Sequence, residues 1–424
     1  MEELQWRTAQ KRVNDLIPQD INPRVISDKQ MSDLKKNLKK FNLVEIPAID
    51  LNGKILAGHQ RISALKLLGR EEELIDVRIP NRKLTKEESE GYLIASNALG
   101  GDWDFSKLKS FDLDLLTDVG LDQIDLSHFW DKELEVNDEN FNVEDEIKKI
   151  RKPKTKSGDL IYLGPHKLLC ASSTDPKNLK KLFGNDQASM IYSDPPYNLK
   201  IDYAKGIGGK QNYGGNVNDN RSYEEYRKFI KDSLISALTI TKSDCHIFYW
   251  SDQCLIGLIQ ELYRELNITN KRVCLWLKNS QNPTPMVSFN KCYEPAIYGV
   301  IGKPYITPSI QNLNEILNKE LTTGNNLFEE IFDQLDIWLI KRLSGQKYEH
   351  ATSKPPKLHE KAIRRCTKLG DIILDSFSGS GSTIIAGEQL KRKVYALELE
   401  PIFCDLTIKR YKKLTGKKVE VQHG

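Results

Sequence analysis

The 424-residue chain lacks the sequence signals of a membrane-spanning, secreted or metal-binding protein. It has no apolar run near the roughly 18 residues that cross a bilayer, and its charged N-terminus lacks the apolar core of a secretory signal. The seven cysteines are scattered, without C-x-x-C spacing or a companion histidine pattern, so we predict no metal or redox site. We expect reduced, mostly buried thiols in a cytoplasmic protein.

Net charge and repeats also exclude several classes of protein. The formal charge is only +4, so any surface that binds nucleic acid must be a local basic one. There is no internal repeat and no G-x-x-x-x-G-K-[ST] motif, which disfavours a nucleoside triphosphate site of that type. An apolar fraction of 39% with 29% charged residues is typical of a soluble globular protein.

Composition divides the chain into three parts. Residues 1–125 have an α+β pattern, with strands expected at 45–51 and 75–79 and helices at 28–41 and 61–68. Residues 126–156 are first acidic and then basic without apolar periodicity, which predicts a charged linker. Its basic half is either a strip that contacts phosphates or simply a solvated linker.

Residues 157–424 alternate strands and helices, which predicts a doubly wound, mainly parallel α/β sheet with helices on both faces. Residues 303–348 fit this alternation poorly and are expected to be an inserted target-recognition region. The expected strands are 160–163, 167–170, 189–193, 245–250, 272–277, 296–301, 372–375 and 394–398.

A first chemical motif, Asp194-Pro195-Pro196-Tyr197, directly follows an apolar strand. The prolines fix the backbone, so the Pro195 carbonyl is held beside the Asp194 carboxylate. These two oxygens can accept both hydrogens of an exocyclic amine, while Tyr197 offers a face for stacking a planar base. The alternative is a tight turn after a strand, with the acid as a cap.

A second motif, ILDSFSGSGST at 373–383, lies between an expected strand and an expected helix. Gly379 and Gly381 allow a tight turn and close approach of a ligand. Glu398 ends the next strand, where a carboxylate typically binds ribose hydroxyls in a doubly wound fold. A G-x-G turn alone is often only a connection between strand and helix, and the downstream acid strengthens the interpretation.

Together with HATSKPPKL at 350–358, these motifs resemble the DNA methyltransferases that methylate exocyclic amines. Their order resembles the circularly permuted subgroup, in which the catalytic motif precedes the cofactor loop. The resemblance covers about residues 157–415 and includes GDLIYLGPHKLLC, WLK at 276–278, YEP at 293–295 and Arg410. It implies transfer of a methyl group from S-adenosylmethionine to a base flipped out of double-stranded DNA, without a metal.

The resemblance also implies roles for individual residues. The catalytic residues would be Asp194, Pro195, Pro196 and Tyr197, with the aspartate favouring adenine N6 over cytosine N4. The cofactor residues would be Asp375, Phe377, Gly379, Gly381, Ser382, Thr383 and Glu398, with Ser353, Lys354 and Pro355 near the methionine end. A restriction-modification setting is typical of such enzymes.

One position departs from the family pattern, and three segments have two interpretations each. Ala171-Ser172 stands where the family usually has Gly-Asp, so a charge that could contact the cofactor is missing. The glycine-rich stretch 206–215 is either a flap over the site or a surface loop. The basic clusters 391–393 and 409–418 either contact phosphates or are solvated.

The N-terminal part resembles the ParB/sulfiredoxin-like domain over about residues 10–110. The matching stretches are INPR at 21–24, residues 41–69 and NALGGDWDF at 97–105. A phosphate or nucleotide site is then expected at a helix N-terminus, formed by Arg24, Gly58, His59, Gln60 and Arg61. The turn lacks the sulfiredoxin cysteine, so reductase activity is not expected. The alternative is a docking platform without a ligand.

We therefore predict an adenine-N6 DNA methyltransferase. A cytosine-N4 enzyme, an enzyme that methylates protein or RNA, and a non-catalytic ParB-like regulator with a decayed methyltransferase domain remain alternatives. Intact residues at 194–197 and 398 argue against decay. Neither the recognition sequence nor a partner nuclease follows from the sequence, and a homodimer remains open.

Overall fold

The computed structural model describes residues 3–19, 28–97, 105–108, 111, 113–118, 121, 126, 130, 134–137, 141–199, 219–278, 288–307, 335–340 and 354–424. The chain divides into two compact units, Met1–Glu133 and Leu134–Gly424. Arg24, Ser353 and the glycine-rich stretch 206–215 lie outside the described residues.

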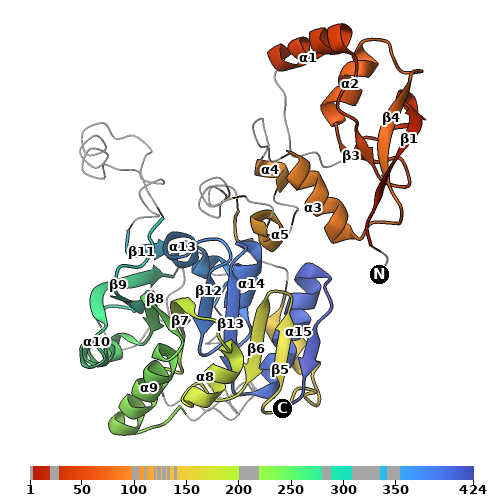
Figure 1. Ribbon diagram of the computed structural model, residues 1–424. Coiled ribbons are helices and arrows are strands. Elements are labelled where there is room, and N and C mark those ends of the chain that lie inside the picture. Colours follow the sequence, from red (N-terminus) through yellow and green to blue (C-terminus); the bar gives the residue numbers. More distant parts are fainter. Residues whose placement is uncertain are drawn as a thin grey trace, which may run out of the picture. The chain divides into compact units, whose positions relative to one another are not determined.

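The N-terminal unit has a four-stranded sheet in the order β1-β4-β2-β3. Strand β1 (Trp6–Arg12) pairs antiparallel with β4 (Leu74–Pro80), and β2 (Ala48–Ile49) pairs with β4 and β3 (Ile55–Ala57). The helices are α1 (Asp28–Phe41), α2 (His59–Leu67), α3 (Lys86–Asn97), α4 (Phe105–Leu108) and α5 (Leu113–Asp118), after a short 3₁₀ turn η1 (Val13–Asp15). Figure 1 shows this unit in red and orange.

The N-terminal predictions hold for the two helices and the 75–79 strand, with small shifts. Helix α1 has the predicted bounds, whereas the strand expected at 45–51 is only the two residues of β2. Strand β1 was not predicted, because its sequence WRTAQKR is polar and mostly exposed. Such charged edge strands are held by pairing rather than by an apolar face.

The C-terminal unit has a ten-stranded sheet in the order β11-β9-β10-β8-β7-β12-β13-β6-β5-β14. The strands are β5 (Leu160–Leu163), β6 (His166–Cys170), β7 (Ala188–Ser193), β8 (Thr241–Trp250), β9 (Thr269–Leu277), β10 (Tyr293–Ile301), β11 (Ile337–Leu339), β12 (Ile372–Asp375), β13 (Lys393–Glu398) and β14 (Glu420–Gln422). All eight predicted strands are therefore present, and the α/β class with a large sheet is confirmed. The central run β8-β7-β12-β13-β6 is parallel, and antiparallel pairs lie towards the edges.

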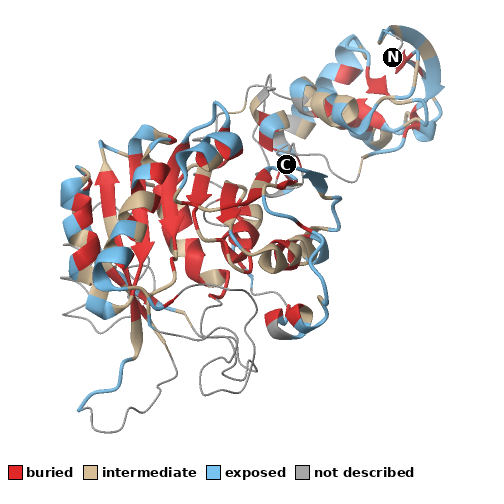
Figure 2. Ribbon diagram, turned by 90° about the horizontal axis from the view of Figure 1, so that it is seen from below, coloured by how far each residue is buried: buried red, intermediate tan, exposed pale blue. Residues whose placement is uncertain are grey.

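Helices cover both faces of this sheet because the strands alternate their side chains between two apolar cores. Met190 and Tyr192 of β7 belong to the core under α13 (Lys357–Cys366), α14 (Ser382–Gln389) and α15 (Pro401–Thr415). Ile191 belongs to the opposite core, under α8 (Pro176–Phe183), α9 (Tyr223–Leu238) and α10 (Ile256–Glu265), which follows the 3₁₀ turn η3 (Gln253–Leu255). Buried residues accordingly concentrate in the strands between the helices (Figure 2).

Part of the predicted linker packs against the C-terminal unit instead of being solvated throughout. Helix α7 (Val143–Lys148) contacts α15, and Phe141, Val143 and Ile147 bury their side chains against Leu406. Asp405 accepts hydrogen bonds from the backbone of Lys154 and Thr155. The segment was expected to be solvated because its few apolar residues, Phe141, Val143, Ile147 and Ile150, are interspersed with charged ones.

Two other expectations need correction. Residues 337–339 of the expected insertion form β11 and pair in parallel with β9 in the main sheet. Arg392 of the basic cluster 391–393 is buried, and its guanidinium donates to the carbonyl oxygens of Thr367 and Leu390, so it supports the fold rather than contacting phosphate. Most of the 303–348 region lies outside the described residues.

Candidate active site

The two chemical motifs meet at the carboxyl ends of adjacent parallel strands. Strand β7 ends at Ser193, directly before Asp194, and pairs with β12, which ends at Asp375. Strand β13, on the other side of β12, ends at Glu398. Ligands of open α/β sheets bind at such carboxyl edges, so motifs that are distant in sequence share one site.

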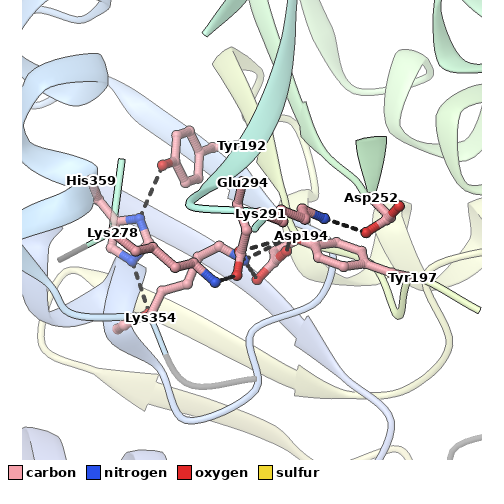
Figure 3. Close-up of polar contacts among 10 residues, drawn as sticks. Tyr192, Asp194, Tyr197, Asp252, Lys278, Lys291, Glu294, Lys354 and His359 are labelled. Carbon is pink, nitrogen blue, oxygen red and sulfur yellow. Dashed lines mark hydrogen bonds and ion pairs between the residues drawn. The ribbon is translucent and has the colours of Figure 1, made fainter. Parts of the chain in front are cut away.

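The Asp194 carboxylate lies in a dense polar cluster (Figure 3). It accepts a hydrogen bond from Tyr197 Oη at 2.7 Å and pairs with the ammonium of Lys354. Burial raises the pKa of Asp194, an effect that the nearby Lys354 opposes. The side chain still has 25% exposure, so a ligand can reach it.

The tetrapeptide backbone is fixed by more than its prolines. Tyr226 on α9 donates its hydroxyl to the Pro196 carbonyl at 2.8 Å. Asn198 adopts a positive φ of 57°, and its backbone amide donates a hydrogen bond to Asp219 Oδ1 at 2.7 Å. These contacts hold the turn after β7 without using the Asp194 carboxylate.

Two residues absent from the predicted set, Glu294 and Lys278, complete this cluster. Glu294 on β10 pairs with Lys278, which follows β9, and lies 3.4 Å from the Lys354 ammonium. Burial alone would raise the pKa of Glu294, but Lys354 and Lys278 hold it below its usual value. Both residues lie in the WLK and YEP stretches, which the resemblance included without giving them a role.

The loop after β12 is built around the Glu398 carboxylate. Glu398 accepts hydrogen bonds from the amides of Gly379 at 2.7 Å and Glu400 at 2.8 Å. Burial raises the pKa values of Asp375 and Glu398 to about 7. Gly381 has a φ of 76°, and a side chain there would meet Thr407, so the turn requires glycine.

Ser382 and Thr383 support the loop from helix α14. The Ser382 hydroxyl shares a 2.8 Å hydrogen bond with His359 Nε2, and His359 Nδ1 lies 3.1 Å from the Tyr192 hydroxyl on β7. Burial lowers the pKa of His359 to about 3, so the ring is neutral. His359 thus joins β7, which precedes Asp194, to Ser382 at the start of α14, a role that no local sequence signal indicates.

The residues present fit an adenosyl cofactor. Within the described part of the chain, the hydroxyls of Ser376 and Ser378 are buried without a hydrogen-bond partner. Glu398 carries the acceptor chemistry that ribose hydroxyls need, and the Phe377 ring packs 5.7 Å from that of Phe229. Ser172 stands where the family usually has an aspartate, and its hydroxyl shares a 2.8 Å hydrogen bond with Thr174 Oγ1. The preceding residue, Ala171, donates its backbone amide to the Glu398 carbonyl.

The predicted N-terminal site is only partly brought together. Gly58 has a φ of 95° at the start of α2, and the half-exposed Arg61 pairs with Glu45. Burial lowers the pKa of His59 to about 4, so it is a neutral acceptor, here of the Gln19 amide at 3.4 Å. His59 therefore supplies no positive charge to a phosphate near pH 7.

Among the described residues, no helix is long and apolar enough to cross a membrane, and no cluster of three or more histidine, cysteine or acidic side chains could hold a metal ion.

The fold and the two motifs at one sheet edge define the class as methyltransferases that act on amino groups.

Known proteins narrow this class. Residues 188–409, more than half of the chain, match the N6/N4 methyltransferase family, described as DNA methylase. The type II methyltransferase M2.DpnII of Streptococcus pneumoniae is 27% identical over 283 residues, which cover 62% of this chain and 93% of that protein. M2.MboI of Moraxella bovis is 28% identical over 240 residues, covering 55% and 84%.

Among solved structures, the M1.HpyAVI–SAM complex covers 57% of this chain and 98% of its own, with 19% identity and a TM-score of 0.39. The chain belongs to the N6/N4 DNA methylase family. Like that family, it is a DNA methyltransferase that uses S-adenosylmethionine.

Proposed function

We propose that this DNA methyltransferase methylates N6 of adenine. The observation that carries the proposal is the Asp194 carboxylate at the end of β7, bonded to Tyr197 and adjacent to the cofactor strand β12. In the family pattern, an acid at the first position of this tetrapeptide accompanies adenine, and a serine accompanies cytosine. Ser193 precedes Asp194, but only the aspartate register keeps both prolines and Tyr197 in place.

In the proposed reaction, S-adenosylmethionine would supply an electrophilic methyl group on a sulfonium centre, and breaking of the S–CH₃ bond would leave the neutral thioether S-adenosylhomocysteine. Asp194 and the Pro195 carbonyl accept the two hydrogens of the amine, which draws its lone pair out of ring conjugation. Tyr197 and Pro196 line the place of the flipped base. Asp194, whose pKa is raised by burial, is suited to take the proton that the amine loses once the new N–C bond has formed.

The cofactor side of the proposal assigns each acid one task. Glu398, already fixed by two amides, would bind the ribose hydroxyls, and Asp375 would help to hold the cofactor. Phe377 and the turn at Gly379 and Gly381 shape the adenosine site. Catalysis then depends mostly on positioning and desolvation.

We also infer two features of the architecture. The strand that carries Asp194 precedes the cofactor strand in sequence although the two are neighbours in the sheet, which is the arrangement expected of a circularly permuted methyltransferase. The four-stranded sheet with α2 beginning at Gly58 supports a ParB-like N-terminal unit. A nucleotide or DNA phosphate at this helix start remains part of the proposal.

The test is to treat DNA with the purified protein and labelled cofactor, hydrolyse it and separate the nucleosides. We expect label in N6-methyladenine. Label only in N4-methylcytosine would overturn the choice of base, and no label in DNA would overturn the proposed function altogether. Modified-base sequencing of DNA from cells that express the chain then gives the recognition sequence.

A further inference from the structure

The Lys354 ammonium occupies the place on Asp194 that the proposed function gives to the target amine. It pairs with Asp194, lies 2.9 Å from Tyr197 Oη and lies 3.4 Å from Glu294 Oε2. It also lies 4.9 Å from the centre of the Trp250 ring, within cation–π range. Oxygens of Asp194, Tyr197 and Glu294, residues drawn in Figure 3, and the Trp250 ring therefore surround one cationic nitrogen.

This environment is complementary to the nitrogen that reacts. An exocyclic amine that gains a methyl group is positively charged until it loses a proton. In that state it resembles the ammonium of a lysine side chain. A site that holds the Lys354 ammonium on acceptors thus also stabilises the cationic amine. Tyr197 lies on Oδ1 of Asp194 and Lys354 on Oδ2, so the entering amine competes with the Lys354 ammonium for this carboxylate, and two cationic nitrogens on it repel each other.

Glu294 offers Lys354 another partner. It lies on the rigid strand β10, opposite Trp276 of β9, and its other oxygen is held by Lys278. The long, flexible stem of a lysine lets its ammonium shift from one carboxylate to the other with little backbone movement. The side chains of Lys354 and Glu294 are only 8% and 12% exposed. Water therefore hydrates either charge poorly, and each needs a charged partner within the protein.

We propose that Glu294 is a positioning residue that takes over the Lys354 ammonium when the target amine enters and so releases Asp194 to bind that amine. The inference rests on the proposed role of Asp194. Before the base arrives, Lys354 bridges the two carboxylates. Afterwards Lys354 and Lys278 both neutralise Glu294, and Asp194 faces the nitrogen that becomes cationic.

A double-mutant cycle in the full chain tests this coupling. The variants are Glu294→Gln, which keeps the shape and removes the charge, Lys354→Met, and the two combined. The substrate is duplex DNA with the methylated site found by modified-base sequencing. We expect Glu294→Gln to raise KM for DNA about tenfold, with a smaller change in kcat, because Lys354 then stays on Asp194.

In the Lys354→Met background, the added Glu294→Gln change should alter KM less than about twofold, since no ammonium remains to be moved. Glu294→Asp should restore part of the loss because it keeps the charge. The matched control is Glu265→Gln on α10, which removes another carboxylate with two cationic partners, Arg227 and Lys231 of α9. Equal losses in both backgrounds, or no loss at all, would overturn the proposal.

A second measurement needs neither DNA nor activity. The ligand-free protein is acetylated on its amines, and the rate at Lys354 is compared by mass spectrometry with that at the exposed Lys228. We expect slow labelling of Lys354 in the wild type and faster labelling in Asp194→Asn and Glu294→Gln. Fast labelling in the wild type would refute the bridge, whereas absent methyl transfer with a protected Lys354 would refute only the proposed function.

Discussion

Replacing Phe141 by alanine should destabilise the C-terminal unit although the residue lies in the segment predicted to be a linker. Phe141 is only 5% exposed and packs in one cluster with Val143, Ile147 and Leu406. Its ring also lies 5.7 Å from the Arg410 guanidinium. Arg410 donates to the backbone and hydroxyl oxygens of Ser380, within the cofactor loop, so the change should also reach the cofactor site.

The magnitude follows from the size of the side chain that is lost. Truncating a buried phenylalanine costs roughly 3–5 kcal/mol of unfolding free energy, and the lower end applies to a small cluster near the surface. The lost cation–π contacts with Arg410 and Lys413 contribute about 0.5–1 kcal/mol each to such a cost. A loss of about 3 kcal/mol lowers Tm by roughly 6 °C in a unit of this size.

Thermal and urea unfolding of the full chain measure the loss of unfolding free energy in Phe141→Ala. Titration with S-adenosylmethionine measures the cofactor affinity, which we expect to fall severalfold. The matched control is Phe289→Ala, since Phe289 is 88% exposed in the same unit. A truncated chain of residues 134–424 should unfold with the same free energy as the C-terminal unit of the full chain. A chain of residues 157–424 should be less stable, because it lacks Phe141, Val143 and Ile147. A Phe141→Ala melting curve that coincides with that of Phe289→Ala would refute the packing argument.

Three further predictions concern the active site. Asp194→Ala should abolish methyl transfer while cofactor affinity changes less than about threefold, because the carboxylate faces the amine; activity within a few-fold of wild type would contradict its role. Gly381→Ala should weaken cofactor binding by about tenfold or more, measured by calorimetry, since a φ of 76° and contact with Thr407 both disfavour a side chain; unchanged affinity would show that the turn adapts. Cofactor affinity should fall as pH drops from 8 to 6, because Asp375 and Glu398, with pKa values near 7, become protonated and lose acceptor strength; a flat profile would mean that neither carboxylate needs its charge.

The sequence was most informative where a motif is local. A strand followed by Asp194-Pro195-Pro196-Tyr197, and another followed by a glycine turn, could be placed because strand and turn signals lie within a few residues of each other. The pairing of β7 with β12 agrees with the general rule that a doubly wound sheet brings such carboxyl ends together. The cofactor and the family follow from these motifs.

Tertiary structure alone decided which groups fill the space between the motifs. Glu294 on β10 and Lys278 after β9 join the cluster around Lys354, and His359 bridges Tyr192 and Ser382, although these residues are far apart in the chain. Their identities are common ones with no fixed spacing, so no local pattern marks them.

The same reason explains the error over the linker. Whether a charged segment is solvated depends on the surface that its few apolar residues meet, and Leu406 lies far away in sequence. The sequence by itself determined the chemistry of this methyltransferase, because reactive groups need particular residue types at close spacing. Packing across the folded chain determined how that chemistry is held, because burial and pairing arise only between segments that folding brings together.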